Sequence, residues 1–277
     1  MAKDVYITSN GIKIHLFILE AQVASPVIIF IHATGFYAQY YIDLLSMLNQ
    51  RGFTVIGVDL QGHGRSEGRR GDFTIPEAVQ NIRDVTSFAI QNYNDRIGIF
   101  GTSQGGIITF YALGVDTRLK SAMCQGAAIL SEKQAACILP RRGKILKYFV
   151  LTIGRFIKWF RIYLWAYIDR HTFYVEEKRL KELGQDPLFV RTYTFRSLHS
   201  LATSPPPYKI ENIKTPVMFI HAENDGIFPL SYMRSLYDKL TCSRKLEVIP
   251  GEKHMFLVEH PAAAIDIIDQ WFKETLK

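Results

Sequence analysis

Short apolar runs alternate with amphipathic stretches along most of the chain. Two segments of alternating polarity flank Asn10-Gly11, a dipeptide typical of a two-residue hairpin. Continuous apolar runs predict strands buried on both faces, and apolar residues at every third or fourth position predict helices. The predicted strands are 5–9, 12–19, 27–31, 55–58, 97–100, 122–124, 217–221 and 246–249. The predicted helices are 40–49, 75–92, 107–113, 230–240 and 262–276.

This alternation stops after Gly126 and resumes beyond the stiff connector 204–207, Ser-Pro-Pro-Pro. Strands alternating with helices on both sides of one break predict a mostly parallel sheet flanked by helices and interrupted by an insertion. A chain of 277 residues is long enough for such a domain. We therefore predict an α/β core made of residues 1–126 and 208–277, and an inserted helical cap over residues 127–207.

The junction between the predicted strand 97–100 and the helix that follows carries a nucleophile motif. Gly101-Thr102-Ser103-Gln104-Gly105 fits G-x-S-x-G in a strand-turn-helix context, in which the serine hydroxyl stands exposed on a sharp turn. Glycines at positions 101 and 105 let strand and helix pass closely, because a Cβ there would clash. Ser103 is therefore the predicted nucleophile.

A serine hydroxyl is a weak nucleophile at neutral pH, so it needs a base, and the base needs an acid to orient it. In this arrangement the order along the chain is serine, acid, histidine, with both partners placed after strands. Asp225 and His254 follow the predicted strands 217–221 and 246–249. Glu223 is the weaker candidate for the acid because it lies nearer to the strand end.

The tetrahedral intermediate of acyl transfer carries an oxyanion that two backbone N–H groups must meet. One should come from Gln104, the residue after the nucleophile, and the other from Thr34, in the loop after strand 27–31. Phe36 and Tyr37 either line an acyl pocket or pack beneath the cap. No metal site is predicted.

Several motifs together resemble the α/β-hydrolase superfamily: HATGF, DLQGHGRSEG, GTSQGG, the aspartate of HAENDGIFP and the histidine of GEKH. The loop GHGRSEG resembles the branch of monoacylglycerol lipases and lysophospholipases. Many relatives have His-Gly where this chain has His32-Ala33. The resemblance, which excludes residues 127–207, implies cofactor-free hydrolysis of an ester or thioester. His63 and Ser66 are expected to be structural, because this loop fits no phosphate-binding glycine pattern.

The positive charge of the chain is concentrated in the insertion. Between Lys133 and Arg170 there are nine Lys or Arg residues and one acid, a balance of +8 against +7 for the whole chain. Residues 144–168 read as a basic amphipathic helix with a broad aromatic apolar face, which is typical of a helix at a membrane interface. The alternative to membrane contact is an ordinary cap helix with a charged outer face. In either case we expect the apolar face, with Trp159 and Phe160, to roof Ser103 and contact the substrate.

These features predict a serine carboxylester hydrolase acting on a monoacylglycerol or lysophospholipid-like lipid. A thioesterase on acyl-CoA or an acyl carrier shares the same chemistry, and a non-catalytic protein of the same fold is a third reading. No module for nucleic acid accompanies the charge. Three widely spaced cysteines and the absence of an apolar leader predict a cytoplasmic chain, in contact with the inner face of a membrane through residues 144–168.

Overall fold

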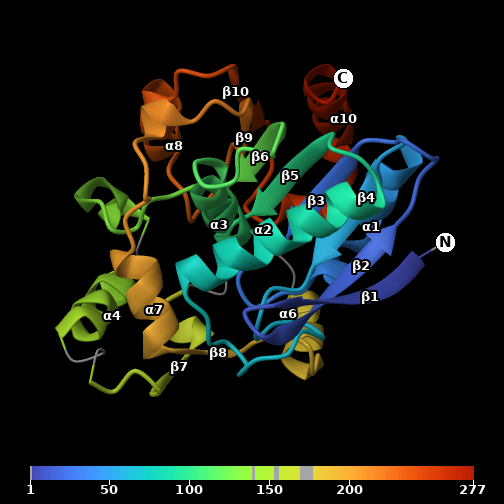
Figure 1. The fold of residues 1–277 in the computed structure, drawn as a ribbon. Coiled ribbons are helices and arrows are strands. Elements are labelled where there is room, and N and C mark those ends of the chain that lie inside the picture. The colour runs from blue at the N-terminus through green and yellow to red at the C-terminus, as the bar shows by residue number, and fades with distance from the viewer. Residues whose placement is uncertain (1, 139–140, 153–155, 169–176) are drawn as a thin grey trace.

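The computed structural model describes residues 2–138, 141–152, 156–168 and 177–277. An eight-stranded sheet has the order β1-β2-β4-β3-β5-β6-β9-β10, in which β1 and β2 are antiparallel to their neighbours and the others are parallel (Figure 1). Its strands are β1 Ala2–Ser9, β2 Ile12–Leu19, β3 Val27–Ile31, β4 Thr54–Val58, β5 Ile97–Thr102, β6 Ser121–Gln125, β9 Val217–Ala222 and β10 Arg244–Ile249.

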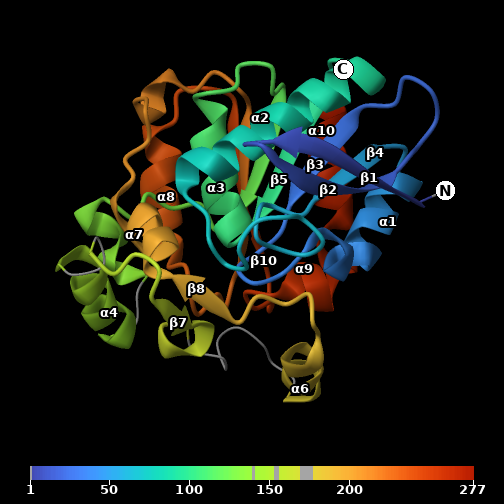
Figure 2. The same cartoon turned by 60° about the horizontal axis from the view of Figure 1, so that its bottom comes forward.

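Helices cover both faces of this sheet. α2 and α3 pack against each other on one face, while α1 and α10 contact each other on the opposite face (Figure 2). The central strands β3, β4, β5 and β6 are buried along their whole length, as their apolar runs predict. The helices of the core are α1 Ile42–Gln50, α2 Ile75–Asn92, α3 Gln104–Leu113, α8 Leu230–Lys239, α9 Phe256–Glu259 and α10 Ile265–Thr275.

The predicted α/β class is confirmed, and most predicted core elements lie within a few residues of the observed ones. The hairpin turns at Asn10-Gly11, where both residues have positive φ. The predicted helix 40–49 begins instead as a 3₁₀ turn, Ala38–Tyr41, before α1. The last predicted helix is divided, since a 3₁₀ turn, Pro261–Ala263, precedes α10.

The segment between β6 and β9 adds no strand to the eight-stranded sheet within the described ranges. Figures 1 and 2 place its elements beyond the edge of the sheet toward which the parallel strands point. Its described helices and strands are η2 Lys133–Cys137, α4 Arg141–Thr152, β7 Arg161–Tyr163, η3 Leu164–Ala166, α6 Glu177–Gln185, β8 Thr192–Thr194, α7 Phe195–Thr203 and η4 Ile210–Asn212.

The prediction of a single helix over residues 144–168 is wrong. α4 ends at Thr152, and the stretch from Arg161 to Tyr163 is strand β7, which pairs antiparallel with β8. Arg155, one of the basic residues assigned to the predicted helix face, lies outside the described residues. The 3.6-residue pattern in this stretch is local, whereas the pairing of Ile162 with Tyr193 joins positions far apart in the sequence and overrides it.

A buried carboxylate holds the loop that carries GHGRSEG. Asp59 lies directly after β4 and accepts hydrogen bonds from the N–H groups of Ala38 (2.7 Å) and Arg65 (2.9 Å). Its Oδ2 also lies 2.9 Å from Nδ1 of His15, which is buried on β2. Ser66 in the same loop accepts from the N–H of His15 and donates to the carbonyl of Asp59. The loop is thus tied to the sheet through Asp59, and Ser66 has the structural position that was expected.

Candidate active site

Ser103 lies at the turn between β5 and α3 in a strained backbone conformation. Its φ of 51° and ψ of −118° fall in a region that non-glycine residues rarely adopt. A Cβ at Gly101 would lie 2.2 Å from the carbonyl oxygen of Gly105, and one at Gly105 would lie 2.3 Å from that of Ile31. The two glycines therefore permit the close approach of β3, β5 and α3 that forces the turn at Ser103.

Asp225 and His254 lie in the loops after β9 and β10, and both loops reach the turn that carries Ser103. Nδ1 of His254 lies 2.8 Å from Oδ2 of Asp225, and Nε2 lies 3.0 Å from Oγ of Ser103. The side chains of His254 and Asp225 are both 0% exposed. An ionised carboxylate only accepts hydrogen bonds, so Nδ1 carries the proton and Nε2 is left to accept from the hydroxyl. The structure thus joins the three predicted residues in one hydrogen-bonded series.

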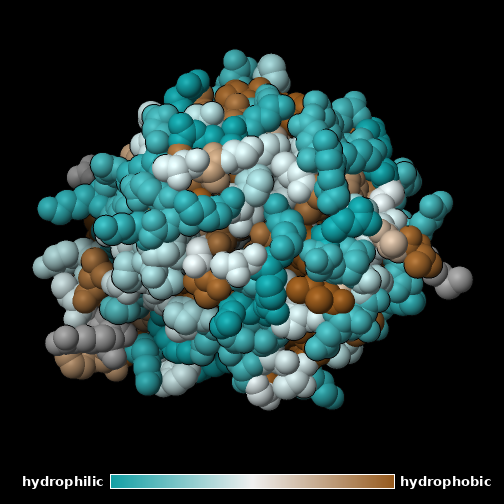
Figure 3. Space-filling model, turned by 45° about the horizontal axis from the view of Figure 1, so that its top comes forward, coloured by the Kyte–Doolittle hydropathy of each residue, from teal (hydrophilic) through white to brown (hydrophobic). Residues whose placement is uncertain are grey.

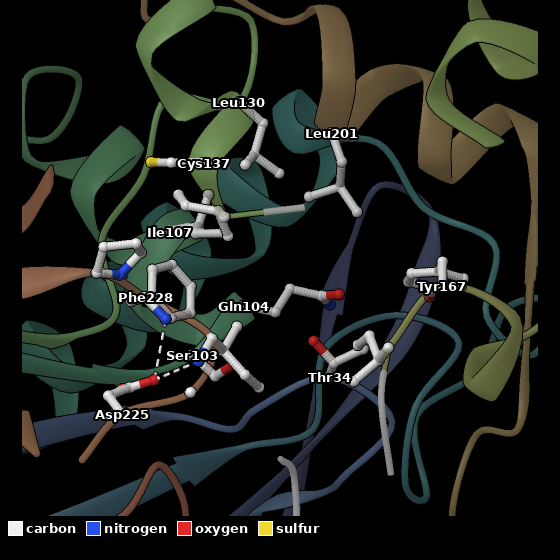
Figure 4. Close-up of a pocket in the computed structure, with 15 residues that line it drawn as sticks. Thr34, Ser103, Gln104, Ile107, Leu130, Cys137, Tyr167, Leu201, Asp225 and Phe228 are labelled. Atoms are coloured by element: carbon white, nitrogen blue, oxygen red, sulfur yellow. Dashed lines mark hydrogen bonds between the residues drawn. The ribbon is translucent and has the colours of Figure 1, made fainter. Parts of the chain in front are cut away.

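Asp225 is held in its ionised form by its surroundings. Burial acts to raise the pKa of its carboxyl, but the electrostatic attraction of the His254 ring, the hydrogen bond from that ring and two backbone N–H donors outweigh burial and lower the pKa. Those donors are the N–H groups of Ile227 (2.8 Å) and Phe228 (2.9 Å) to Oδ1 (Figure 4). The ring of Phe228 also stacks on His254, with centroids 5.6 Å apart. Both planes of the imidazole–carboxylate pair are therefore fixed.

Glu223, the weaker candidate for the acid, lies apart from this series. Its carboxylate is exposed and accepts a hydrogen bond from the N–H of Gly251 at 2.7 Å. It ties the turn after β10 to the end of β9, and Asp225 alone of the two contacts the imidazole of His254 within the described ranges.

The two predicted oxyanion donors, Thr34 and Gln104, line the same cavity as Ser103. Gln104 is the first residue of α3, so its N–H has no acceptor within the helix. The carbonyl of Ala33 accepts from the N–H of Phe36 (3.1 Å) and from Nδ1 of His32 (2.9 Å). Because a trans peptide directs its C=O and N–H to opposite sides, the N–H of Thr34 points away from these donors. In the described part of the chain it has no hydrogen-bond partner.

A cavity of about 310 Å³ opens above Ser103. Thr34, Ser103 and Gln104 lie on one side of it, and Leu130 and Leu201 from the inserted segment lie across from them (Figure 4). Its apolar lining comes from α3, from the segment between β6 and β9, and from the loop after β9: Ile107, Leu130, Ile138, Tyr167, Ile168, Leu201, Ile227, Phe228 and Pro229.

Four residues named as substrate contacts do not line this cavity, and two of them, Phe36 and Tyr37, pack against the inserted segment, which was the alternative for them. Phe36 is fully buried against Tyr40, Tyr41 and Phe189, and the hydroxyl of Tyr37 donates to Asp186 at 2.9 Å.

Trp159 and Phe160, the two predicted roof residues, are 49% and 55% exposed and do not line the cavity. They follow α4 in a turn that faces outward, because the predicted continuous helix does not form. The prediction that these side chains form the roof over Ser103 is therefore not supported by their positions.

Gln125 contacts both ends of the serine–histidine pair, and the sequence analysis missed it. Its Oε1 accepts from the N–H of Ser103 at 3.2 Å, and its Nε2 donates to the carbonyl of His254 at 3.0 Å. A polar residue at the end of a buried strand that neighbours the nucleophile strand is the signal that could have revealed it.

The described residues contain no group of three or more His, Cys, Asp or Glu side chains placed to hold a metal ion.

Three comparisons show which known proteins this chain is similar to. A family model described as "Serine aminopeptidase, S33" matches residues 22–261. An uncharacterized 31.7 kDa protein from the traX-finO intergenic region of Escherichia coli is 26% identical, over 97% of each chain. A monoacylglycerol lipase of Mycolicibacterium smegmatis is 21% identical, over 88% of this chain and 87% of that protein.

The fold has solved counterparts. A soluble variant of monoglyceride lipase from Saccharomyces cerevisiae, in complex with a substrate analog, matches with a TM-score of 0.79 and 17% identity, over 99% of this chain and 96% of that one. The family match spans most of the sequence, including the segments that carry Thr34, Ser103, Asp225 and His254. The chain therefore belongs to the family described as serine aminopeptidase, S33, and has the α/β-hydrolase fold.

Proposed function

We propose that this protein is a serine carboxylester hydrolase that cleaves a monoacyl lipid, a monoacylglycerol or lysophospholipid, through an acyl-enzyme. The observation that carries the proposal is the series Ser103–His254–Asp225 at the base of an apolar cavity. A hydroxyl already hydrogen-bonded to an imidazole can lose its proton as it attacks a carbonyl. An apolar cavity next to it favours an acyl chain as the group that it holds.

The reaction follows from these positions. Oγ of Ser103 attacks the ester carbonyl and its proton passes to Nε2 of His254, while the N–H groups of Thr34 and Gln104 stabilise the oxyanion. Collapse of the intermediate breaks the ester C–O bond, and His254 protonates the leaving alcohol. Water then attacks the acyl-enzyme with His254 as base, and the fatty acid leaves with Ser103 restored.

We further propose that the inserted segment is a cap that docks on an anionic membrane. Nine of the twelve large hydrophobic side chains that are exposed in the described residues lie between positions 145 and 163. They are Ile145, Tyr148, Phe149, Leu151, Phe156, Ile157, Trp159, Phe160 and Tyr163. By contrast, the face in Figure 3 is mostly hydrophilic, with small separate apolar areas.

The cationic side chains beside this surface favour an anionic membrane as its partner. Lys158 lies over the ring of Trp159 at 5.3 Å, and Arg69 of the core lies over the same ring at 5.2 Å. Cations beside exposed aromatic rings suit the headgroup depth of an anionic bilayer. No helix in the described ranges is long and apolar enough to span a membrane. In our proposal docking involves the surface of the bilayer, and the lipid substrate enters beneath the cap.

The proposal predicts that esters with longer acyl chains are hydrolysed faster and that anionic vesicles raise the rate. Hydrolysis of p-nitrophenyl esters from acetate to palmitate, of monoacylglycerols and of acyl-CoA is measured with and without phosphatidylglycerol vesicles. We expect long-chain esters to exceed acetate in kcat/KM and vesicles to raise the rate. A preference for acetate or butyrate with no effect of vesicles would contradict the proposal, and faster turnover of acyl-CoA would indicate a thioesterase.

A paired substitution separates docking from catalysis. Phe156→Ser with Ile157→Ser should weaken vesicle binding by about tenfold or more, since each exposed apolar side chain contributes ~1.5–3 kcal/mol when buried. Tyr6→Ser with Val23→Ser removes two exposed apolar side chains outside this surface and should leave vesicle binding unchanged. Sedimentation with vesicles measures both. Equal binding by the two double variants would show that this surface does not dock.

A further inference from the structure

Tyr193 is the middle residue of β8 in the inserted segment, yet its side chain is fully buried between loops of the core. It does not line the cavity above Ser103. Its hydroxyl oxygen lies 2.7 Å from the N–H of Gly35 and 2.8 Å from Nε2 of His63. One hydroxyl of the insertion therefore joins the loop after β3 to the loop after β4.

The direction of both hydrogen bonds follows from His63. Nδ1 of His63 lies 3.0 Å from the carbonyl oxygen of Gln61, which only accepts, so Nδ1 carries the proton. Burial, with a smaller effect of the neighbouring His32, lowers the pKa of His63 to about 3, so the ring is neutral and Nε2 is an acceptor. Tyr193 thus donates to His63, and a lone pair of its oxygen accepts from the N–H of Gly35.

This bond fixes a peptide group beside the predicted oxyanion donor. The N–H of Gly35 belongs to the peptide that follows Thr34, and the peptide before Thr34 is held through the carbonyl of Ala33. With both flanking peptide planes fixed, the direction of the Thr34 N–H is determined.

The inserted segment holds Gly35 on a second side as well. The N–H of Val190 donates to the carbonyl of Gly35 at 2.8 Å. A Cβ at Gly35 would lie 2.7 Å from the ring of Phe189, so the loop lies directly against this part of the insertion. Phe189, Val190 and Tyr193 of the insertion thus lie against Gly35, and of these three Tyr193 makes its contact through a side-chain hydroxyl.

We propose that Tyr193 is a positioning residue for the oxyanion hole, and that His63 orients its hydroxyl. The inference rests on the proposed function, because it assigns the oxyanion to the N–H of Thr34. Removal of the hydroxyl releases the Thr34–Gly35 peptide, so the alignment of the Thr34 N–H then depends on the hydrogen bonds of the Ala33 carbonyl alone, and the oxyanion meets a less well pre-aligned donor. The cap thereby contributes to the chemical step without contact with substrate.

The test is Tyr193→Phe, with Tyr111→Phe as the matched control. Tyr111 is also buried, and its hydroxyl donates to the carbonyl of Ser204 at 2.6 Å, in contact with neither loop. For the ester that wild type hydrolyses best, we expect Tyr193→Phe to lower kcat by about 10- to 100-fold, with KM within about twofold. Binding of a trifluoromethyl ketone of the same chain length should weaken by a similar factor, while inhibition by the free fatty acid stays unchanged.

A kcat equal to that of Tyr111→Phe, or a raised KM with kcat unchanged, would overturn the inference. A loss that appears equally in ketone and fatty-acid binding would indicate a distorted pocket and would overturn it as well. His63→Gln should show a smaller fall in kcat, and adding Tyr193→Phe to it should give no more than the loss from Tyr193→Phe alone. Should Tyr193→Phe fail to fold, the ketone and fatty-acid affinities of His63→Gln decide the same question.

The rate of Ser103 labelling by a fluorophosphonate separates this inference from the proposed function, because labelling uses the oxyanion donors but needs no ester. Slower labelling of Tyr193→Phe in a protein that hydrolyses no ester supports the inference and contradicts the function. Unchanged labelling and unchanged ester turnover contradict the inference and leave the function intact.

Discussion

Ser103→Ala should lower kcat by about 10³-fold or more, with little change in KM or in Tm. The hydroxyl is the group that forms the covalent bond, and no other side chain lies in its place at the turn between β5 and α3 among the described residues. Removal of a nucleophile commonly leaves only the catalysis that the oxyanion donors and binding provide. Steady-state hydrolysis of the preferred ester measures the effect.

His254→Ala should cause a loss of the same size, and the double variant should be no worse than either single one. Ser103 and His254 act as one unit through the 3.0 Å hydrogen bond, so the second removal has nothing left to disable. If the two losses multiplied instead, Ser103 and His254 would act independently, and the role of His254 as the base for Ser103 would be wrong.

Asp225→Asn should lower kcat by about 10³- to 10⁴-fold while leaving measurable activity. An amide in this position donates to Nδ1 of His254, which moves the proton to Nε2 and takes away the acceptor for the hydroxyl of Ser103. Because the carboxyl is held ionised by its neighbours, wild type should keep this orientation as the pH falls through the usual carboxylate range. A pH–rate profile of both proteins measures the effect.

Glu223→Gln is the control for this substitution. The carboxylate of Glu223 is exposed and bonded only to the N–H of Gly251 among the contacts described, so activity should stay within about twofold of wild type. A silent Asp225→Asn together with an inactive Glu223→Gln would reverse the assignment of the acid.

The sequence predicted the parts of the fold and site that depend on local pattern. Buried parallel strands appear as apolar runs, and the turn at Ser103 is marked by glycines that the close packing of β3, β5 and α3 requires. Strand ends in a parallel sheet gather at one edge, which is why Asp225 and His254 could be expected near Ser103.

The internal structure of the inserted segment could not be predicted from local sequence pattern. The pairing of β7 with β8 is a long-range contact, and a local helical period in the same residues gives no sign of it. Leu130 and Leu201 line the cavity, but an apolar residue that faces a cavity looks in sequence like one that faces the core. The interaction of Tyr193 with Gly35 spans 158 positions and involves a residue type that is common in buried cores.

The central claim is that an acyl group becomes bonded to Ser103 during turnover. Rapid acid quench of the protein with a long-chain p-nitrophenyl ester, followed by mass spectrometry of the peptide that contains residue 103, tests this directly. We predict an increase equal to the acyl group on Ser103, formed in a burst with p-nitrophenol and absent from Ser103→Ala. Steady turnover with an acyl group on another residue, or undiminished turnover by Ser103→Ala, would contradict the account.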